Sequence, residues 1–391
     1  MSSAALEAET YEEMFGILRD RLADVVPEVE LAAKAEVALE VNRLKKERGA
    51  VILGHNYMEP ALYHSVCDFT GDSLQLSREA ARTDGDPIVF CGVRFMAETA
   101  KILSPDRTVL LPTPKGGCSL AESITAEDVR KLKERYPGVP VVTYVNTYAA
   151  VKAESDVCCT SSNAAKVVES LDSDVVIMLP DEFLAQNVAR ETGKRILFPS
   201  VGRNGGADGN GPSGPEADAG GNGRGAVAGS AGDTSVAPGA GLGEPEDVDP
   251  DYQMIGWRGR CEVHDKFTTH DVANVRSQFP DVMVLAHPEC SPEVVDAADF
   301  SGSTSAMIQA VQESNAARYL LLTECSMGDN IAAENPSKEM VRLCSVRCPH
   351  MNEITLEDTL EALRRNRYRI EVDEDVRVRA LGALERMLEI G

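Results

Sequence analysis

Cysteines near the ends of short apolar segments are the first residues of this chain that could bind a metal. Cys118 follows two glycines in PKGGCSL, Cys261 follows RGR, and the third candidate is either Cys325 in TEC or the later pair Cys344 and Cys348. Three thiolates from separate segments could bind an iron-sulfur cluster and leave one iron open. The sequence has no C-x-x-C pair, so reduced structural cysteines are the alternative. Zinc fits less well, because structural zinc sites usually use paired ligands close in sequence.

Polar side chains directly follow three apolar segments that read as buried strands. GHNY places His55 after the first, TYVNT follows the second, and AHPEC places His287 and Glu289 after the third. Ligands of open α/β sheets bind at the carboxyl ends of the strands, so these residues are candidates for ligand contacts. His264 in CEVHDKF is either a supporting or a structural residue. The cysteines of VCCTSSN are expected to be small buried apolar residues.

The elements that must position these residues form a repeated pattern. Short β-branched segments alternate with helix-like segments in the order strand, helix, strand, helix, strand, and this unit occurs three times. The pattern indicates parallel sheets covered on both faces. The sequence therefore predicts an α/β fold of three similar βαβαβ domains, each with three layers (α/β/α), and a ligand site where they converge. The expected ranges are 1–48 for N-terminal helices, 49–130, 131–265 and 266–350 for the three domains, and 351–391 for two closing helices.

The segment 202–251 differs in composition from the rest of the chain. It is rich in glycine and acidic residues and nearly lacks large apolar residues, so it cannot bury enough surface to offset the entropy of ordering. We expect a disordered insertion in the second domain without a catalytic part. The alternative is a segment that binds a partner.

Charge and hydropathy exclude several classes of function. The formal net charge of −24 argues against nucleic acid or an anionic membrane as partner, because phosphates would be repelled. No apolar segment approaches the roughly 18 residues needed to cross a bilayer, and the start MSSAALEAETYEE is acidic, so we expect a cytoplasmic protein. The acidic, arginine-rich balance indicates a halophilic source, with an ordinary acidic enzyme as the alternative.

A set of ordered motifs resembles the quinolinate synthase family of de novo NAD biosynthesis. The motifs are ILGHNYMEP, FTGDSLQLSREA, VFCGVRFMAETAKIL, PKGGCSLAES, TYVNTYAAVKAESDVCCTSSNA, WRGRCEVHDKF, HPEC and GSTSAMI, from about Val51 to Leu356. The resemblance implies three α/β domains in pseudo-threefold arrangement around a central site with a 4Fe-4S cluster. It also implies a transferase that condenses iminoaspartate (iminosuccinate) with dihydroxyacetone phosphate to quinolinate, releasing phosphate and water.

The resemblance assigns cluster ligands and catalytic residues. The ligands would be Cys118, Cys261 and Cys348, the last because PHMN follows it. The open iron would act as a Lewis acid without net redox change. Tyr57, Tyr144 and Glu289 are the candidates for moving protons.

The resemblance also implies substrate contacts and partners. The substrate contacts would be His55, Ser73, Tyr144, Asn146, Ser161, His287, Glu289 and Thr304. An enzyme that supplies iminoaspartate, L-aspartate oxidase or aspartate dehydrogenase, would be a functional partner. Two alternatives are an iron-sulfur sensor or binding protein on the same scaffold, and a zinc-dependent hydrolase or aldolase.

Overall fold

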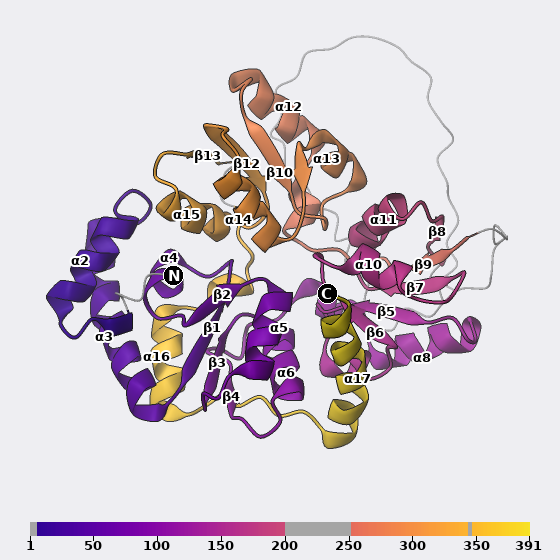
Figure 1. Ribbon diagram of the computed structural model, residues 1–391, viewed down its shortest axis with the longest axis horizontal. Helices are drawn as coiled ribbons and strands as arrows, with labels where there is room; N and C mark the ends of the chain where they lie inside the picture. Colours follow the sequence, from indigo (N-terminus) through magenta and orange to yellow (C-terminus); the bar gives the residue numbers. More distant parts are fainter. Residues whose placement is uncertain (1–5, 200–251, 343–345) are drawn as a thin grey trace, which may run out of the picture.

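The computed structural model describes residues 6–199, 252–342 and 346–391. The predicted insertion at 202–251 and the candidate Cys344 therefore lie outside the described residues. Figure 1 shows three groups of strands, each with its own helices, which meet near the centre of the molecule.

The N-terminal region forms two helices where the sequence predicts helix throughout. α2 starts at a capping box in which Thr10 and Glu13 satisfy each other's backbone N–H groups, and α3 ends at Gly49, whose φ of 64° is in the left-handed region that glycine tolerates. Pro27 separates the two helices because proline fits directly before the first turn. The helices are α2 (Tyr11–Leu22) and α3 (Glu28–Arg48).

The first sheet has four parallel strands in the order β2-β1-β3-β4. All five residues of β1 are buried, as expected for a strand covered on both faces. Its elements are β1 (Val51–His55), α4 (Pro60–Ser65), β2 (Phe69–Gly71), α5 (Ser73–Arg82), β3 (Ile88–Cys91), α6 (Arg94–Leu103) and β4 (Val109–Leu110), followed by α7 (Ser119–Glu122) and α8 (Ala126–Arg135).

The second sheet has five parallel strands in the order β6-β5-β7-β9-β8. Cys158 and Cys159 lie in β6 and are completely buried, which confirms their expected role as small apolar residues. Its elements are β5 (Val141–Tyr144), α9 (Ala149–Lys152), β6 (Val157–Cys159), α10 (Ala164–Glu169), β7 (Val176–Leu179), α11 (Glu182–Glu191), β8 (Ile196–Leu197) and β9 (Met254–Gly256).

The third sheet repeats the strand order of the first, as β11-β10-β12-β13. A short 3-10 helix, η1 (His264–Lys266), and α12 (Thr269–Gln278) lead into it. Its elements are β10 (Met283–Ala286), α13 (Pro292–Ala297), β11 (Phe300–Ser301), α14 (Thr304–Glu313), β12 (Arg318–Leu322), α15 (Cys325–Glu334) and β13 (Glu339–Val341).

Two helices close the chain, as predicted. α16 (Leu356–Arg365) is capped by Thr355, and α17 (Glu374–Ile390) packs against β6, α9 and α6. One large core therefore includes residues of the first and second sheets together with both terminal helical regions, whereas the third sheet has separate cores on its two faces. Within the described ranges, no helix combines the length and apolar character needed to cross a bilayer. A further 3-10 helix, η2 (Met351–Glu353), precedes α16.

The sequence prediction of three parallel α/β units is confirmed, but each sheet has more strands than the three expected. The additional strands are β2, β6, β9 and β13, each of three residues. Segments this short carry no recognisable periodicity, and their pairing depends on a neighbouring strand already in place. The expected boundary at residue 130 falls inside α8.

Candidate active site

One pocket lies where strand ends from all three sheets meet. It contains about 690 Å³ of space between protein atoms, a figure that includes open solvent at its mouth. All the residues that the family resemblance assigns as ligands, substrate contacts or catalytic groups line this pocket: His55, Tyr57, Ser73, Cys118, Tyr144, Asn146, Ser161, Cys261, His287, Glu289, Thr304 and Cys348.

Equivalent strand ends supply several of these side chains. His55 is the last residue of β1, Tyr144 is the last residue of β5, and His287 directly follows β10. These strands occupy the same place in their sheets, beside the short second strand. The rule that ligands bind at the carboxyl edge of parallel strands therefore applies three times to one pocket.

The starts of two helices supply hydroxyl groups. Ser73 and Thr304 are the first residues of α5 and α14, which are capped by Asp72 and Ser303. The Ser303 hydroxyl donates to Asp72 Oδ2 at 3.1 Å, so the two helix starts are fixed to each other across the first and third sheets. Their N-termini face the pocket, where backbone N–H groups and the helix dipole favour anionic groups.

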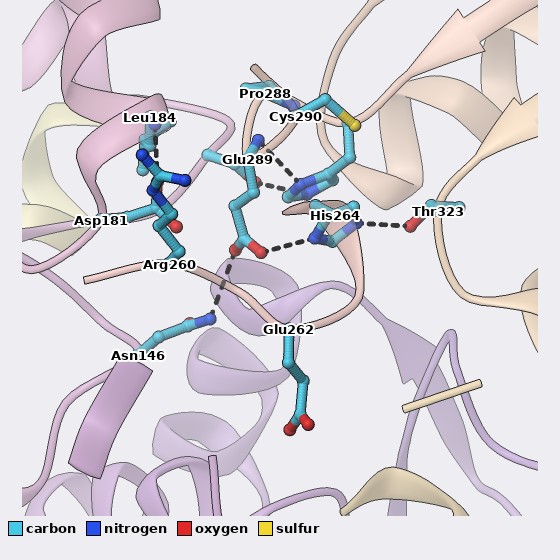
Figure 2. Close-up of polar contacts among 12 residues, drawn as sticks. Asn146, Asp181, Leu184, Arg260, Glu262, His264, Pro288, Glu289, Cys290 and Thr323 are labelled. Carbon is cyan, nitrogen blue, oxygen red and sulfur yellow. Dashed lines mark hydrogen bonds and ion pairs between the residues drawn. The ribbon is translucent and has the colours of Figure 1, made fainter. Parts of the chain in front are cut away.

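A chain of hydrogen bonds crosses the pocket from one tyrosine to another. The Tyr57 hydroxyl lies 2.6 Å from Thr323 Oγ1, which lies 2.9 Å from His264 Nε2. His264 Nδ1 lies 2.7 Å from Glu289 Oε2, and the Tyr144 hydroxyl donates to Glu289 Oε1 at 2.5 Å. Figure 2 shows His264 between Glu289 and Thr323. The chain connects groups from all three sheets and can carry a proton between its ends.

The sequence left two members of this chain unassigned. His264 was open between a supporting and a structural role, and the structure places it at the centre of the chain, with 1% of its surface exposed. Thr323 was not singled out, although it directly follows β12 and so has the same strand-end position as the recognised residues.

Further contacts surround Glu289 and His287. Asn146 Nδ2 donates to Glu289 Oε1 at 3.4 Å (Figure 2), while Asn146 Oδ1 is buried without a hydrogen-bond partner among the described residues. Ser161 Oγ lies 3.3 Å from His287 Nε2, and the ring of His287 stacks on that of His264 with centroids 4.5 Å apart. Asn146 and Ser161 therefore present polar atoms to the space where a ligand would bind.

Burial sets the protonation states of the pocket. It lowers the pKa of His55 to about 4 and that of His287 to about 3, so both imidazoles are neutral near pH 7. Burial and the charge of Glu289 raise the pKa of Tyr57 and of Tyr144, so both phenols keep their protons. Burial opposes ionisation of Glu289, but His264 and the hydrogen bonds with His264 and Tyr144 outweigh it and lower the pKa of Glu289.

A second buried carboxyl group, missed by the sequence analysis, lies close to Glu289. Asp181 caps α11 through the backbone N–H of Leu184 at 2.7 Å, and its Oδ2 has no hydrogen-bond partner among the described residues. Burial and then the charge of Glu289 raise the pKa of Asp181. Two carboxyl groups with pKa values moved in opposite directions are typical of acid–base sites (Figure 2).

Loops from different parts of the chain bring three thiols to the pocket. Cys118 precedes α7, Cys261 follows β9, and Cys348 lies between β13 and α16. Cys325, the alternative third ligand, is the first residue of α15 and does not line the pocket. Of the candidates for the third thiol, the described structure therefore favours Cys348, and Cys344 lies outside the described residues.

The surroundings of the three thiols fit a metal cluster. Burial raises the pKa of each, to about 11 for Cys348, so a metal would have to displace the protons. At Gly117 a Cβ atom would lie 2.6 Å from Glu122 Oε1 and 3.2 Å from the His350 ring. A larger residue at position 117 would therefore require the side chains of Glu122 and His350 to shift.

The distances between the donor atoms indicate whether the three thiols could bind a single metal ion or only a larger cluster. Among the described residues, the group of three metal-binding donors that lie within 4.8 Å of one another is Cys261, His264 and Glu289. The three thiols do not form such a group, so they are too far apart to bind one tetrahedral ion at roughly 2.3 Å each. In the other group, His264 and Glu289 are already hydrogen-bonded to each other.

These features define an α/β enzyme of three parallel-sheet units whose shared pocket combines acid–base side chains with thiols suited to a metal cluster. The chain belongs to the quinolinate synthetase A protein family, whose profile matches residues 39–389.

Curated relatives agree with this assignment. The chain is 46% identical over 371 residues to quinolinate synthase 1 of Mesorhizobium japonicum, covering 95% of this chain and 96% of the relative. It is 46% identical over 373 residues to quinolinate synthase of Agrobacterium fabrum, covering 95% and 91%. It is 46% identical over 347 residues to quinolinate synthase of Xylella fastidiosa, covering 89% and 85%. These names do not favour the sensor or the zinc enzyme.

Proposed function

We propose that the protein condenses iminoaspartate with dihydroxyacetone phosphate to form quinolinate, one phosphate and two waters. The observation that carries the proposal is that acid–base groups, hydroxyl and amide donors and three thiols, all assigned from family motifs, line one pocket. The family match over residues 39–389 supports the same activity.

The pocket is suited to anionic substrates without a basic patch. No lysine or arginine lines it among the described residues, so carboxylates and phosphate would bind through hydroxyl, amide, imidazole and backbone N–H groups. In our proposal Ser73 and Thr304, at the starts of α5 and α14, and Ser161 and Asn146 make these contacts. His55 and His287 contribute as neutral imidazoles.

Glu289, Tyr57 and Tyr144 are proposed to move protons. The condensation requires a proton to leave carbon, and each dehydration requires a proton on the departing oxygen. Glu289 is ionised and can accept a proton, while the two phenols are protonated and can donate. His264 and Thr323 connect Glu289 to Tyr57, so a proton taken at one end of the chain can be returned at the other.

Cys118, Cys261 and Cys348 are proposed to hold a 4Fe-4S cluster. When bound, a cluster with one iron that has no protein ligand supplies a Lewis acid for a substrate oxygen, without net redox change. The protein's part is to provide three thiolates that line one pocket.

The proposal includes the arrangement and setting of the enzyme. We infer pseudo-threefold symmetry of the domains 49–130, 131–265 and 266–350, supported by the shared order of the first three strands in each sheet. A cytoplasmic location is supported by the free thiols of all described cysteines. Iminoaspartate would come from an oxidase or a dehydrogenase that acts on aspartate.

The test is anaerobic reconstitution with iron and sulfide, followed by assay of quinolinate from an iminoaspartate source and dihydroxyacetone phosphate. Serine substitution of Cys118, Cys261 or Cys348 should abolish cluster binding and product formation. Cys325→Ser is the matched control, because Cys325 is also a half-buried loop-end thiol but lies outside the pocket. A colourless protein with stoichiometric zinc, or full activity of the three serine variants, would contradict the proposal.

A further inference from the structure

Lys152, the last residue of α9, is a buried cation that the proposed function does not use. Its side chain is completely buried, and its Nζ donates to the carbonyl oxygen of Val145 at 2.8 Å and to that of Thr147. The hydrogen bonds of its ammonium group go to these carbonyl oxygens, and the charge of the Glu98 carboxylate also favours its protonated form. Burying an ammonium group without a directly bonded carboxylate is costly, so a compensating role is expected.

Other buried lysines of the protein differ in this respect. Lys34 pairs with Glu59 at 3.0 Å, and Lys45 pairs with Asp68 at 2.9 Å. Lys45 also donates to a backbone carbonyl, that of Val66. Lys152 therefore differs from Lys34 and Lys45 in that, in the described part of the chain, its hydrogen bonds go only to carbonyl oxygens of one short turn.

The turn that Lys152 holds carries two residues of the pocket. Its carbonyl acceptors, Val145 and Thr147, flank Asn146, and Tyr144 directly precedes them. The turn is closed by the Thr147 hydroxyl, which donates to the carbonyl of Tyr144 at 3.2 Å. Both Tyr144 and Asn146 donate to Glu289, so a displacement of the turn would change the surroundings of the carboxylate.

Lys152 also lies directly behind the wall of the pocket. Its Nζ is 5.5 Å from the centroid of the Phe95 ring, and Phe95 lines the pocket. Burial lowers the pKa of Lys152 to about 8, so the ammonium form still predominates near pH 7. The charge can therefore act on the turn without contacting a substrate.

We propose that Lys152 is a positioning residue whose ammonium group fixes the turn from Tyr144 to Thr147, so that Asn146 and Tyr144 are held in reacting geometry around Glu289. This inference rests on the proposed function, which assigns a substrate contact to Asn146 and a proton transfer to Tyr144. The role is indirect: Lys152 would act on the reaction through Asn146 and Tyr144.

The first measurement needs no substrate. Hydrogen exchange of the backbone amides from Val141 to Ala153 should be faster in Lys152→Met than in wild type, because the turn loses the donor to two carbonyl groups. Lys45→Met is the matched control: it also removes a buried lysine that donates to a backbone carbonyl, and it should leave this segment unchanged. Wild-type exchange in Lys152→Met would overturn the proposal.

The second measurement is a double-mutant cycle on kcat/KM. Lys152→Met should lower kcat/KM at least about 10-fold, because small displacements of reacting groups are costly. Because Lys152 holds both Asn146 and Tyr144, the loss in the double variant Lys152→Met, Asn146→Ala should be smaller than the product of the two single losses. A double variant whose loss equals the product of the two single losses would overturn the proposal.

A second variant and the exchange measurement cover the cases in which Lys152→Met does not fold or wild type is inactive. If Lys152→Met does not fold, Lys152→Gln replaces the ammonium group with a neutral amide on a shorter side chain and is measured in the same way, with the same directions of change expected. If wild type forms no quinolinate, the proposed function fails, whereas the exchange comparison still decides whether Lys152 fixes the turn.

Discussion

Glu289 is the residue at which the hydrogen bonds of the pocket converge. Its two oxygens have three side-chain partners, His264, Tyr144 and Asn146, which come from different segments of the chain. A buried carboxylate with this many partners is held in one orientation. Glu289 is therefore suited to act as a base towards a bound substrate.

Replacing Glu289 with glutamine should remove the carboxylate base and keep a side chain of nearly the same size and shape. We expect kcat to fall by about 10²–10⁴-fold, the usual contribution of a general base, with iron and sulfide content unchanged. Glu59→Gln is the control, because it removes a half-buried carboxylate that is paired with Lys34 and lies outside the pocket. Turnover of Glu289→Gln above a tenth of wild type, with a normal cluster, would argue against this role.

The protonation of the buried His64 side chain should make the stability of the fold depend on pH. It is buried in α4, and neither ring nitrogen has a hydrogen bond of normal geometry, although the backbone of Asn330 lies close enough to favour protonation. Burial, with Arg21, lowers the pKa of His64 to about 3. In the unfolded chain a histidine has a pKa of about 6.5, so between these values the unfolded state binds the proton.

Because the unfolded state binds more protons there, stability should fall as the pH falls below about 6.5. At pH 5.5 His64 should cost about 1.4 kcal/mol relative to pH 8. His64→Phe removes this cost, so its free energy of unfolding relative to wild type should rise by about that amount between pH 8 and pH 5.5. Urea denaturation at both pH values measures the difference, and an equal difference at the two would contradict the assignment.

At the scale of elements, the parallel strands fix the positions of the pocket residues, whereas the connection between β8 and β9 can differ in length and sequence. β8 and β9 are adjacent in the second sheet, with Ile196 paired to Met254 and Leu197 to Ile255. The chain between them in sequence supplies no pocket residue within the described ranges. β9 leads directly to Cys261, so the position of β9 in the sheet fixes where this thiol enters the pocket.

Deleting Gly205 to Glu246 should therefore leave cluster content and quinolinate formation within about twofold of wild type. The residues kept on either side, 198–204 and 247–253, can span roughly 46 Å when extended, far more than the length of two short strands. Iron and sulfide analysis and the quinolinate assay would measure the result. A matched deletion that also removes β9 should abolish both, and loss of both on deleting Gly205 to Glu246 alone would show that the segment has a catalytic part.

At the scale of the whole molecule, charge is the dominant feature. The chain carries 63 acidic and 39 basic residues, a formal net charge of −24. Self-repulsion of this size destabilises a compact state, and salt reduces it, since the screening length falls from about 10 Å at 0.1 M to about 3 Å at 1 M.

Raising KCl from 0.1 to 1 M should consequently increase the midpoint of thermal unfolding by several degrees. A variant in which the exposed residues Glu36, Glu169 and Glu385 are replaced by glutamine should show a smaller increase and a higher midpoint at low salt. Calorimetry of the two proteins across the salt series measures this. A midpoint that is constant or falls with KCl would contradict the expectation of a protein adapted to high salt.

Local patterns in the sequence determined the three parallel α/β units and the candidate residues at their strand ends. Burial on both faces makes a strand continuously apolar, so a polar residue directly after it, such as His55 or His287, is recognisable without knowledge of other segments. Short strands such as β13, with one exposed and two half-buried residues, lack this signal.

Only the tertiary structure decided which residues act together. Thr323 meets Tyr57 across 266 positions of sequence, and Tyr144 meets Glu289 across 145. It also placed Cys348 rather than Cys325 in the pocket, and brought His264 and Asp181 to Glu289. Contacts between distant segments depend on how the three sheets pack against one another, and packing depends on the shapes of whole surfaces, which no local pattern records.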